Sequence, residues 1–280
     1  MNKTIIITDN AACLSDEECQ RLDIEVFSLP FVLGETTYYE KELGDLKSVM
    51  QIMEQQDNSI FEAQVSLQQI DEVIQKFKQP GVKDIIWIHL AHSISGIGSN
   101  LMAYAKNCDL GGINLHIFDT YTFGPAQGKL ACLAATLAND GVDSATILNM
   151  LEKYRAKLKT LLILGNLKGL KKTGSISNGV NFVSNALLKP KTLLRFSDTG
   201  ELEVLDTHLR MKKFGEKIED YLLTHPEILP VTLLTADEER LADWQEFLTK
   251  RCPQIQLTSG LMPAFLTIYS GAKSTLITWE

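Results

Sequence analysis

Three short polar sequences of this chain carry the side chains best suited to binding or chemistry. They are Thr8-Asp9-Asn10, the loop Ser93–Ser99 and Asp119-Thr120. Each one follows a short apolar run of the length expected of a buried strand. Hydroxyl groups and free backbone N–H groups in such places favour an anionic ligand, particularly where a helix begins.

Catalysis is one use of these residues. Ser93 or Ser95 as nucleophile with His92 as base would make a hydrolase, although the Gly-x-Ser-x-Gly elbow is absent. His92 is the better site histidine, because His89 lies in an apolar run and is expected to be a hydrogen-bonded core residue. The spacing of His89, His92 and His116 does not suit a metal ion. We therefore expect no metal and no other cofactor.

Each candidate also has a structural interpretation. Ser95 alternatively caps the helix that follows it, and Asp9 and Asn10 alternatively bond their own backbone in a turn. Gly96 and Gly98 match neither a P-loop nor a dinucleotide-binding fingerprint, and a positive φ or close packing explains them equally well. Both interpretations stay open from the residues alone.

Strands alternate with helices over the first 150 residues. Apolar runs predict strands at Thr4–Thr8, Ile24–Leu33, Ile85–Leu90 and Asn114–Phe118. Pro30 fits a strand that stops there or lies at a sheet edge. Helices are expected after the capping boxes Ser15 with Glu18 and Ser66 with Gln69, and at Leu46–Met53, Leu101–Ala105, Gly124–Ala138 and Val142–Tyr154. This order predicts a parallel sheet with right-handed crossovers and helices on both faces. The polar sequences would then meet at the carboxyl edge of the sheet, where ligands bind.

The expected order of strands and helices is different in the second half of the chain. Strands are expected at Leu161–Leu164, Lys191–Phe196, Glu201–Asp206, Pro230–Thr235, Gln254–Thr258 and Ser274–Trp279, and helices at Val183–Leu188, Lys212–Leu223 and Glu238–Lys250. Ser197-Asp198-Thr199-Gly200 supplies turn residues for a hairpin. The fold class is therefore α/β with two domains: residues 1–158 with a parallel sheet, and residues 159–280 with a mostly antiparallel sheet and helices on one side.

Composition narrows the class of protein. The formal charge of −8 over 280 residues argues against a nucleic-acid partner, which needs clustered Lys and Arg. The 5 cysteines lack CxxC spacing, so free thiols in a reducing compartment are expected. No stretch approaches the ~20 apolar residues of a membrane span. We expect a cytoplasmic protein.

Several motifs, taken in order, resemble the DegV family of bacterial fatty-acid-binding proteins over nearly the whole chain. They are Thr8-Asp9-Asn10, Gln64-Val65-Ser66, Ser95-Gly96, Phe118-Asp119-Thr120, Leu170-Lys171-Lys172-Thr173-Gly174 and Leu187-Leu188-Lys189-Pro190. The resemblance implies a carrier rather than an enzyme. A long-chain fatty acid would lie in an apolar tunnel between the domains, and its carboxylate would be presented to a separate ATP-dependent fatty acid kinase subunit.

The resemblance also assigns site residues. Ligand contacts are expected from Ser95, Gly96, Glu62, Ala63, Ile97, Ile268 and Tyr269. The crevice around them would be lined by Thr8, Asp9, Asn10, Gln64, Ser66, His92, Ser93, Asp119 and Thr120.

This chain departs from the family pattern at the head-group positions. Glu62 and Ala63 stand where the family has Thr and Ser, Ile97 replaces a Thr, and Ile268 replaces a His. An ionised Glu62 would repel a fatty acid anion. Two alternatives to the carrier therefore stay open: a small-molecule kinase or hydrolase that uses the same crevice, and a diverged regulatory module without ligand. Chain length, unsaturation, kinase partner and oligomeric state are not encoded in these patterns.

Overall fold

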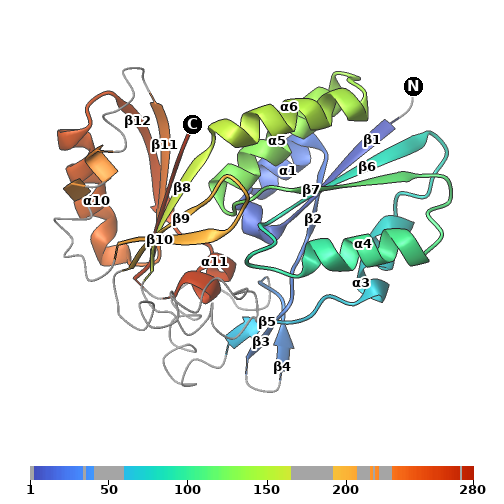
Figure 1. Cartoon of the computed structure of the whole chain (residues 1–280), viewed down its shortest axis with the longest axis horizontal. Coiled ribbons are helices and arrows are strands. Elements are labelled where there is room, and N and C mark those ends of the chain that lie inside the picture. The colour runs from blue at the N-terminus through green and yellow to red at the C-terminus, as the bar shows by residue number, and fades with distance from the viewer. Residues whose placement is uncertain are drawn as a thin grey trace. The chain divides into compact units, whose positions relative to one another are not determined.

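The computed structural model describes residues 3–33, 36–40, 60–164, 192–206, 215–216, 218–220, 229–271 and 273–280 (Figure 1). The chain divides into two compact units. The first unit comprises Met1–Glu40, Glu62–Lys157 and Asp198–Glu201, and the second comprises Lys41–Phe61, Leu158–Ser197 and Leu202–Glu280. The expected helices at Leu46–Met53 and Val183–Leu188, most of the helix at Lys212–Leu223, and the motifs at 170–174 and 187–190 lie outside the described residues.

The first unit contains the expected parallel sheet. Its strand order is β2-β1-β6-β7, and every neighbouring pair is parallel. The strands are β1 (Lys3–Asp9), β2 (Ile24–Phe27), β6 (Val82–His89) and β7 (Asn114–Asp119). The centres of β1 and β6 are continuous runs of buried isoleucines with Trp87 among them, as expected of parallel strands that helices cover on both faces.

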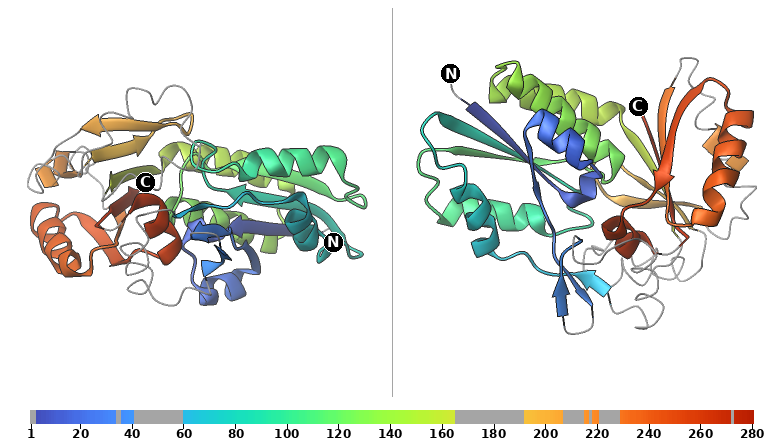
Figure 2. Two further views of the ribbon diagram at one scale, coloured as in Figure 1. Left: turned by 90° about the horizontal axis from the view of Figure 1, so that it is seen from below. Right: turned by 180° about the vertical axis from the view of Figure 1, so that it is seen from behind.

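Two groups of helices cover this sheet. One group is α3 (Leu67–Gln75) with α4 (Ile97–Asn107), and the other is α1 (Asp16–Leu22), α5 (Pro125–Asn139) and α6 (Ser144–Lys157). The groups lie on opposite sides of the sheet (Figure 2). Both capping boxes are confirmed: Ser15 with Glu18 opens α1, and Ser66 with Gln69 opens α3. The helix α3 ends at Gln75, and single turns follow it before Pro80.

The predicted strand at Ile24–Leu33 stops before Pro30 and lies at a sheet edge, as expected, and a second strand follows the proline. Its first part is β2, which is an edge strand of the parallel sheet. Its second part, β3 (Phe31–Leu33), joins a small sheet in the order β4-β3-β5 with β4 (Thr36–Tyr38) and β5 (Ile60–Glu62). Proline cannot donate to a sheet ladder, but its carbonyl accepts a hydrogen bond from the N–H of Ala63 at 2.9 Å.

The second unit contains a six-stranded sheet in the order β10-β9-β8-β13-β11-β12. Its strands are β8 (Lys159–Leu164), β9 (Thr192–Phe196), β10 (Leu202–Asp206), β11 (Leu229–Thr235), β12 (Ile255–Leu261) and β13 (Thr275–Trp279). The hairpin of β9 and β10 is antiparallel, as predicted, and so are all other neighbours except the parallel pair of β11 and β12. The α/β class with one parallel and one mostly antiparallel sheet is confirmed.

Two helices of the second unit lie within the described segments of the chain. The crossover between β11 and β12 is α10 (Glu238–Arg251), which buries Trp244 and Leu248 against Val231, Leu233 and other sheet residues. A further helix, α11 (Ala264–Ser270), was not predicted, and all of its residues are buried. Among the described residues, no helix is both long and apolar enough to cross a membrane. All five cysteines lie in described segments and are free thiols.

Candidate functional site

The order in which strands are added to the parallel sheet reverses between β1 and β6. The chain leaves β1 toward β2 through α1 on one face, and leaves β6 toward β7 through α4 on the other face. In open α/β sheets, ligands bind beyond the carboxyl ends of the strands at such a switch point. The candidate site is therefore the edge where β1, β6 and β7 end.

Asp9 ends β1 at this switch point, and its carboxylate is fully buried. Oδ1 accepts hydrogen bonds from the N–H of Ala11 at 3.0 Å and from Nε2 of Gln127 at 2.9 Å. Oδ2 accepts from the N–H of Leu90 at 3.1 Å, which joins the ends of β1 and β6. Asp9 therefore bonds the backbone of its own turn, as the turn interpretation predicts. The same carboxylate also connects two strands and a helix.

The neighbours of Asp9 are also engaged in holding the chain. The hydroxyl of Thr8 donates to the carbonyl of Ile88 at 2.8 Å. The side chain of Asn10 accepts from the N–H of Leu29 at 3.0 Å and donates to Glu40 at 3.0 Å. These contacts fix the carboxyl end of β1, and a ligand role for Thr8, Asp9 and Asn10 stays a prediction.

The end of β7 meets the loop that follows β6. Thr120 donates to the carbonyl of His89 through its N–H at 3.1 Å and through its hydroxyl at 2.9 Å. Oδ2 of Asp119 accepts from Nδ1 of His92 at 2.7 Å, and Oδ1 accepts from the N–H of Tyr121 at 2.9 Å. The structure thus brings the three polar sequences to one edge, as parallel strands require.

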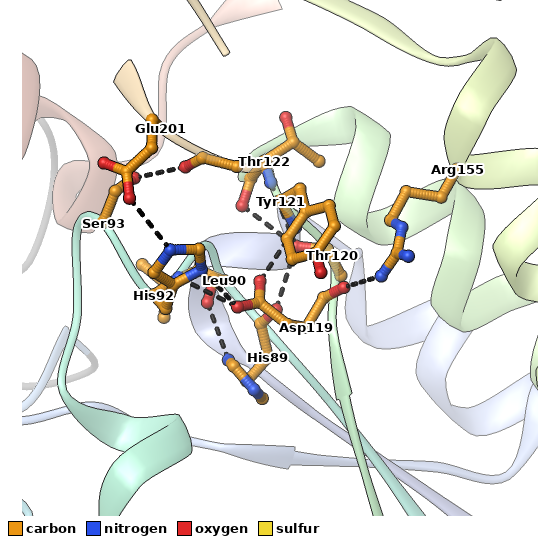
Figure 3. A network of polar contacts seen from close by, with 11 residues as sticks. His89, Leu90, His92, Ser93, Asp119, Thr120, Tyr121, Thr122, Arg155 and Glu201 are labelled. Atoms are coloured by element: carbon orange, nitrogen blue, oxygen red, sulfur yellow. Dashed lines mark hydrogen bonds and ion pairs between the residues drawn. The ribbon is translucent and has the colours of Figure 1, made fainter. Parts of the chain in front are cut away.

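His92 lies between two carboxylates (Figure 3). Nδ1 contacts Asp119, and Nε2 lies 3.3 Å from Oε1 of Glu201, which is 109 residues away in sequence. Burial alone would lower the pKa of His92, but the hydrogen bonds and negative charges of Asp119 and Glu201 outweigh burial and raise it. The hydroxyl of Ser93 donates to the carbonyl of Gly200 at 2.6 Å in the same segment.

Tyr121 and Arg155 complete this network. Tyr121 has a left-handed backbone with φ 56°, which places its ring edge-on to His92. The guanidinium of Arg155, from α6, lies 3.9 Å above the Tyr121 ring and donates to the carbonyl of Asp119 at 2.6 Å. Gly200 packs on the same ring, since a Cβ at this position would lie 2.6 Å from a ring carbon.

The geometry of His92 argues against the hydrolase. A Ser–His pair needs the hydroxyl within hydrogen-bond reach of the imidazole, but both ring nitrogens of His92 face carboxylates and Ser93 donates to a carbonyl. Within the described part of the chain, no group of three or more His, Cys, Asp or Glu side chains is arranged to hold a metal ion.

The loop between β6 and α4 contains the central candidates. Ser95 is 2% exposed, and its hydroxyl accepts from the N–H of Ile97 at 3.2 Å. Gly96 is the N-cap residue of α4, with φ −79°, and a Cβ added there would meet nothing within 4 Å. Neither positive φ nor close packing explains this glycine, so its backbone forms an open place beside the buried hydroxyl of Ser95.

Gly98, in contrast, is required by packing. A Cβ at this position would lie 2.7 Å from Cε1 and 2.8 Å from Nε2 of His89. His89 is buried, and its Nδ1 lies 2.7 Å from the carbonyl of Leu90, so Nδ1 carries the proton in the neutral ring. Burial lowers the pKa of His89. His89 is a hydrogen-bonded core histidine, as predicted, against which α4 begins.

The segment Glu62–Ser66, which contains two of the head-group positions of the family pattern, lies beside α4. Nδ2 of Asn100 in α4 donates to the carbonyl of Val65 at 2.9 Å. Ser66 is exposed and its hydroxyl caps α3, while Gln64 is exposed in the loop. Glu62 is the last residue of β5 and Ala63 follows it. The structure does not describe the side chain of Glu62.

The remaining candidates belong to the second unit. Ile268 and Tyr269 lie in α11 and are buried, and the Tyr269 ring packs edge-on against Phe265 with centroids 4.9 Å apart. Their proximity to Ser95 stays a prediction.

Four residues of the site were not predicted: Tyr121, Gln127, Arg155 and Glu201. Gln127 had a usable signal, because it is the one amide in the first turns of a helix of mostly small and apolar residues. Arg155 and Glu201 had none, since their partners are distant in sequence.

Comparison with known proteins decides the family. The family model described as "Uncharacterised protein, DegV family" matches residues 3–280. The chain belongs to the DegV family. Among curated DegV relatives, a DegV domain-containing protein of Listeria innocua is 24% identical over 285 residues, which covers 100% of this chain and 99% of the relative.

Solved DegV structures share the fold. DegV from Bacillus subtilis, described as a fatty acid binding protein, has a TM-score of 0.84 at 22% identity and covers 100% of this chain and 99% of that chain. The Fatty Acid Kinase (Fak) B3 protein of Streptococcus pneumoniae, loaded with linoleic acid, has a TM-score of 0.78 at 17% identity, with 99% of both chains covered. The predicted family and its two-domain α/β fold are confirmed.

Proposed function

We propose that this DegV protein is a carrier that holds a long-chain fatty acid in an apolar tunnel between its domains and presents the carboxylate to a separate kinase. Membership of the family supports the carrier. The Bacillus subtilis and Streptococcus pneumoniae proteins support it as well, because they are described as a fatty acid binding protein and as a Fatty Acid Kinase protein loaded with linoleic acid. In this proposal the chain itself is no enzyme, its ligand is the acyl chain, and it acts in the cytoplasm.

The loop Ser95-Gly96 carries the proposal. A buried hydroxyl stands next to an open glycine backbone at the switch point of the sheet, immediately before a helix of 11 residues. The first N–H groups of a helix lack partners within the helix, and the helix dipole favours negative charge at this end. A carboxylate over Gly96 would meet both the helix end and the Ser95 hydroxyl.

Substitution of Ser95 tests the head-group site. Ser95→Ala is expected to weaken fatty acid binding about tenfold or more, because a hydrogen bond to an ionised group contributes about 1.5–3 kcal/mol. The protein would be mildly delipidated, exposed to mixed fatty acids and analysed by native mass spectrometry, followed by titration of the retained acid. Ser99→Ala is the matched control, since Ser99 is exposed in the same helix. Failure of the unsubstituted protein to retain any acyl ligand would reject the carrier and favour a regulatory module.

Glu62 supplies a second prediction. Glu62→Thr restores the hydroxyl of the family pattern and removes a carboxylate that would repel the ligand anion, so we expect tighter fatty acid binding. The measurement is the dissociation constant at pH 5 to 8 for both proteins. Glu152→Thr, which removes an exposed acidic residue from α6, controls for net charge. Equal affinities of the Glu62→Thr variant and the unsubstituted protein across this range would mean that Glu62 does not face the ligand.

A further inference from the structure

Both ring nitrogens of His92 lie beside carboxylate oxygens, which favours the protonated, positively charged ring. Nδ1 lies 2.7 Å from a carboxylate oxygen of Asp119, and Nε2 lies 3.3 Å from one of Glu201. Ionised carboxylates only accept hydrogen bonds, and a neutral imidazole has a single N–H. Both contacts are therefore hydrogen bonds only when His92 is an imidazolium, which also makes them charge-assisted.

One of the two carboxylates belongs to a distant turn. Residues 198–201, which we call the hairpin turn, connect β9 to β10 but are part of the first unit. Besides the contact of Glu201, the carbonyl of Gly200 accepts from Ser93 at 2.6 Å, and Gly200 packs on the Tyr121 ring. The hairpin turn thus contacts the beginning of the loop that leads to Ser95 (Figure 3).

The charged and titratable groups around His92 come from four elements. Asp119 ends β7, Glu201 lies in the hairpin turn, and His89 ends β6. Arg155 of α6 contacts the Tyr121 ring. The guanidinium of Arg155 donates to the backbone of Asp119 rather than to its carboxylate. His89 has a lowered pKa, so it is neutral where His92 is charged. The two carboxylates therefore dominate the field at His92.

We propose that His92, as an imidazolium, is a positioning residue that fastens the hairpin turn to Ser93 and thereby fixes the head-group loop Ser95-Gly96. The inference rests on the proposed function for its effect on fatty acid binding. Ser95 and Gly96 would contact the ligand, whereas His92 acts through the loop. Loss of the proton from Nε2, the longer contact, turns a lone pair toward the Glu201 carboxylate and repels it.

The direction of the pH dependence follows from the raised pKa of His92. A raised pKa in the folded protein means that the anchoring is complete at low pH and is lost as the pH rises through that pKa. The hairpin turn is therefore expected to leave Ser93 on the alkaline side, and the affinity for a fatty acid is expected to fall over the same range.

NMR titration of the full-length, ligand-free protein tests the anchoring. We expect the chemical shifts of the His92 imidazole nitrogens to follow a pKa above the ordinary histidine value of about 6.5. The backbone amide shifts of Gly200 and Ser95 should change with the same midpoint. Glu201→Gln should lower the midpoint. Glu203→Gln is the matched control, because Glu203 is paired with Arg195 in the same hairpin and should leave the midpoint unchanged. If the chemical shift of the Gly200 amide does not change as His92 titrates, the proposal is overturned.

The effect on binding needs a separate readout. His92→Gln should bind fatty acid with an affinity that no longer depends on pH and that matches the unsubstituted protein at its alkaline limit. An unaltered pH profile in this variant would overturn the positioning role. If neither protein binds fatty acid, the carrier function fails while the NMR result on the hairpin turn still stands, so the two failures are distinguishable.

Discussion

Replacing Asp9 with Ala is expected to lower the free energy of unfolding of the first unit by about 3–5 kcal/mol. The substitution leaves the N–H groups of Ala11 and Leu90 without their acceptor in the fully buried surroundings of Asp9. It also removes one of the two acceptors of the Gln127 amide, which keeps the Thr8 hydroxyl at 3.1 Å. Each buried donor without a partner costs about 1–3 kcal/mol, and a water molecule in the vacated space restores part of the loss. Hydrogen exchange at increasing urea, followed on peptides from β1 and β6, measures the change in this unit.

Two further variants make the Asp9 result specific. Asp9→Asn keeps one acceptor oxygen but points an NH₂ group at a donor, so it should destabilise the unit by an intermediate amount. Asp140→Ala removes an exposed Asp and should change stability by less than about 0.5 kcal/mol. If Asp9→Ala unfolds at the same urea concentration as Asp140→Ala, the buried carboxylate does not hold the strand ends together.

The second large effect is expected from Gly98→Ala. Its new methyl group would lie 2.7 Å from the His89 ring, which is buried and held by the Leu90 carbonyl. Overpacking of this kind costs about 1–3 kcal/mol, and the better helix propensity of Ala offsets up to about 1 kcal/mol. We expect a net destabilisation of about 1–2 kcal/mol, together with weaker fatty acid binding because α4 begins in the wrong place.

Gly96→Ala is the matched control for Gly98→Ala. It adds the same methyl group two residues earlier, at a position with ordinary φ and open space. Thermal unfolding should therefore differ little from that of the unsubstituted protein. Fatty acid affinity should nevertheless fall, because the methyl group occupies the space proposed for the carboxylate. Equal stability of the two variants would show that His89 gives way to Gly98→Ala without cost.

Local patterns predicted the elements that local physics controls. Capping boxes fixed the starts of α1 and α3, and isoleucine runs identified β1 and β6 as buried parallel strands. The meeting of the strand ends followed from the same parallel order. In contrast, α11 was missed because it is buried on all sides and has no amphipathic stripe to distinguish it from a core strand.

Contacts between residues that are far apart in the sequence determine the features that were not predicted. The requirement for Gly98 is set by the position of His89 across a loop, and the parallel pairing of β11 with β12 depends on the return of α10 across the sheet. Glu201 read only as the start of a strand, although its carboxylate reaches His92. No spacing within the sequence encodes these partners, so the outline of the candidate site was predictable and its electrostatics were not.

The sequence order of the first unit also bears on protein synthesis. A nascent chain delivers β1, β6 and β7 early, but Asp198–Glu201 leaves the ribosome only after β8 and β9 have been translated. Until then His92 and Tyr121 have no hairpin turn to bind. The polar edge therefore reaches its final form late during translation, and a fragment that stops at residue 158 would never complete it.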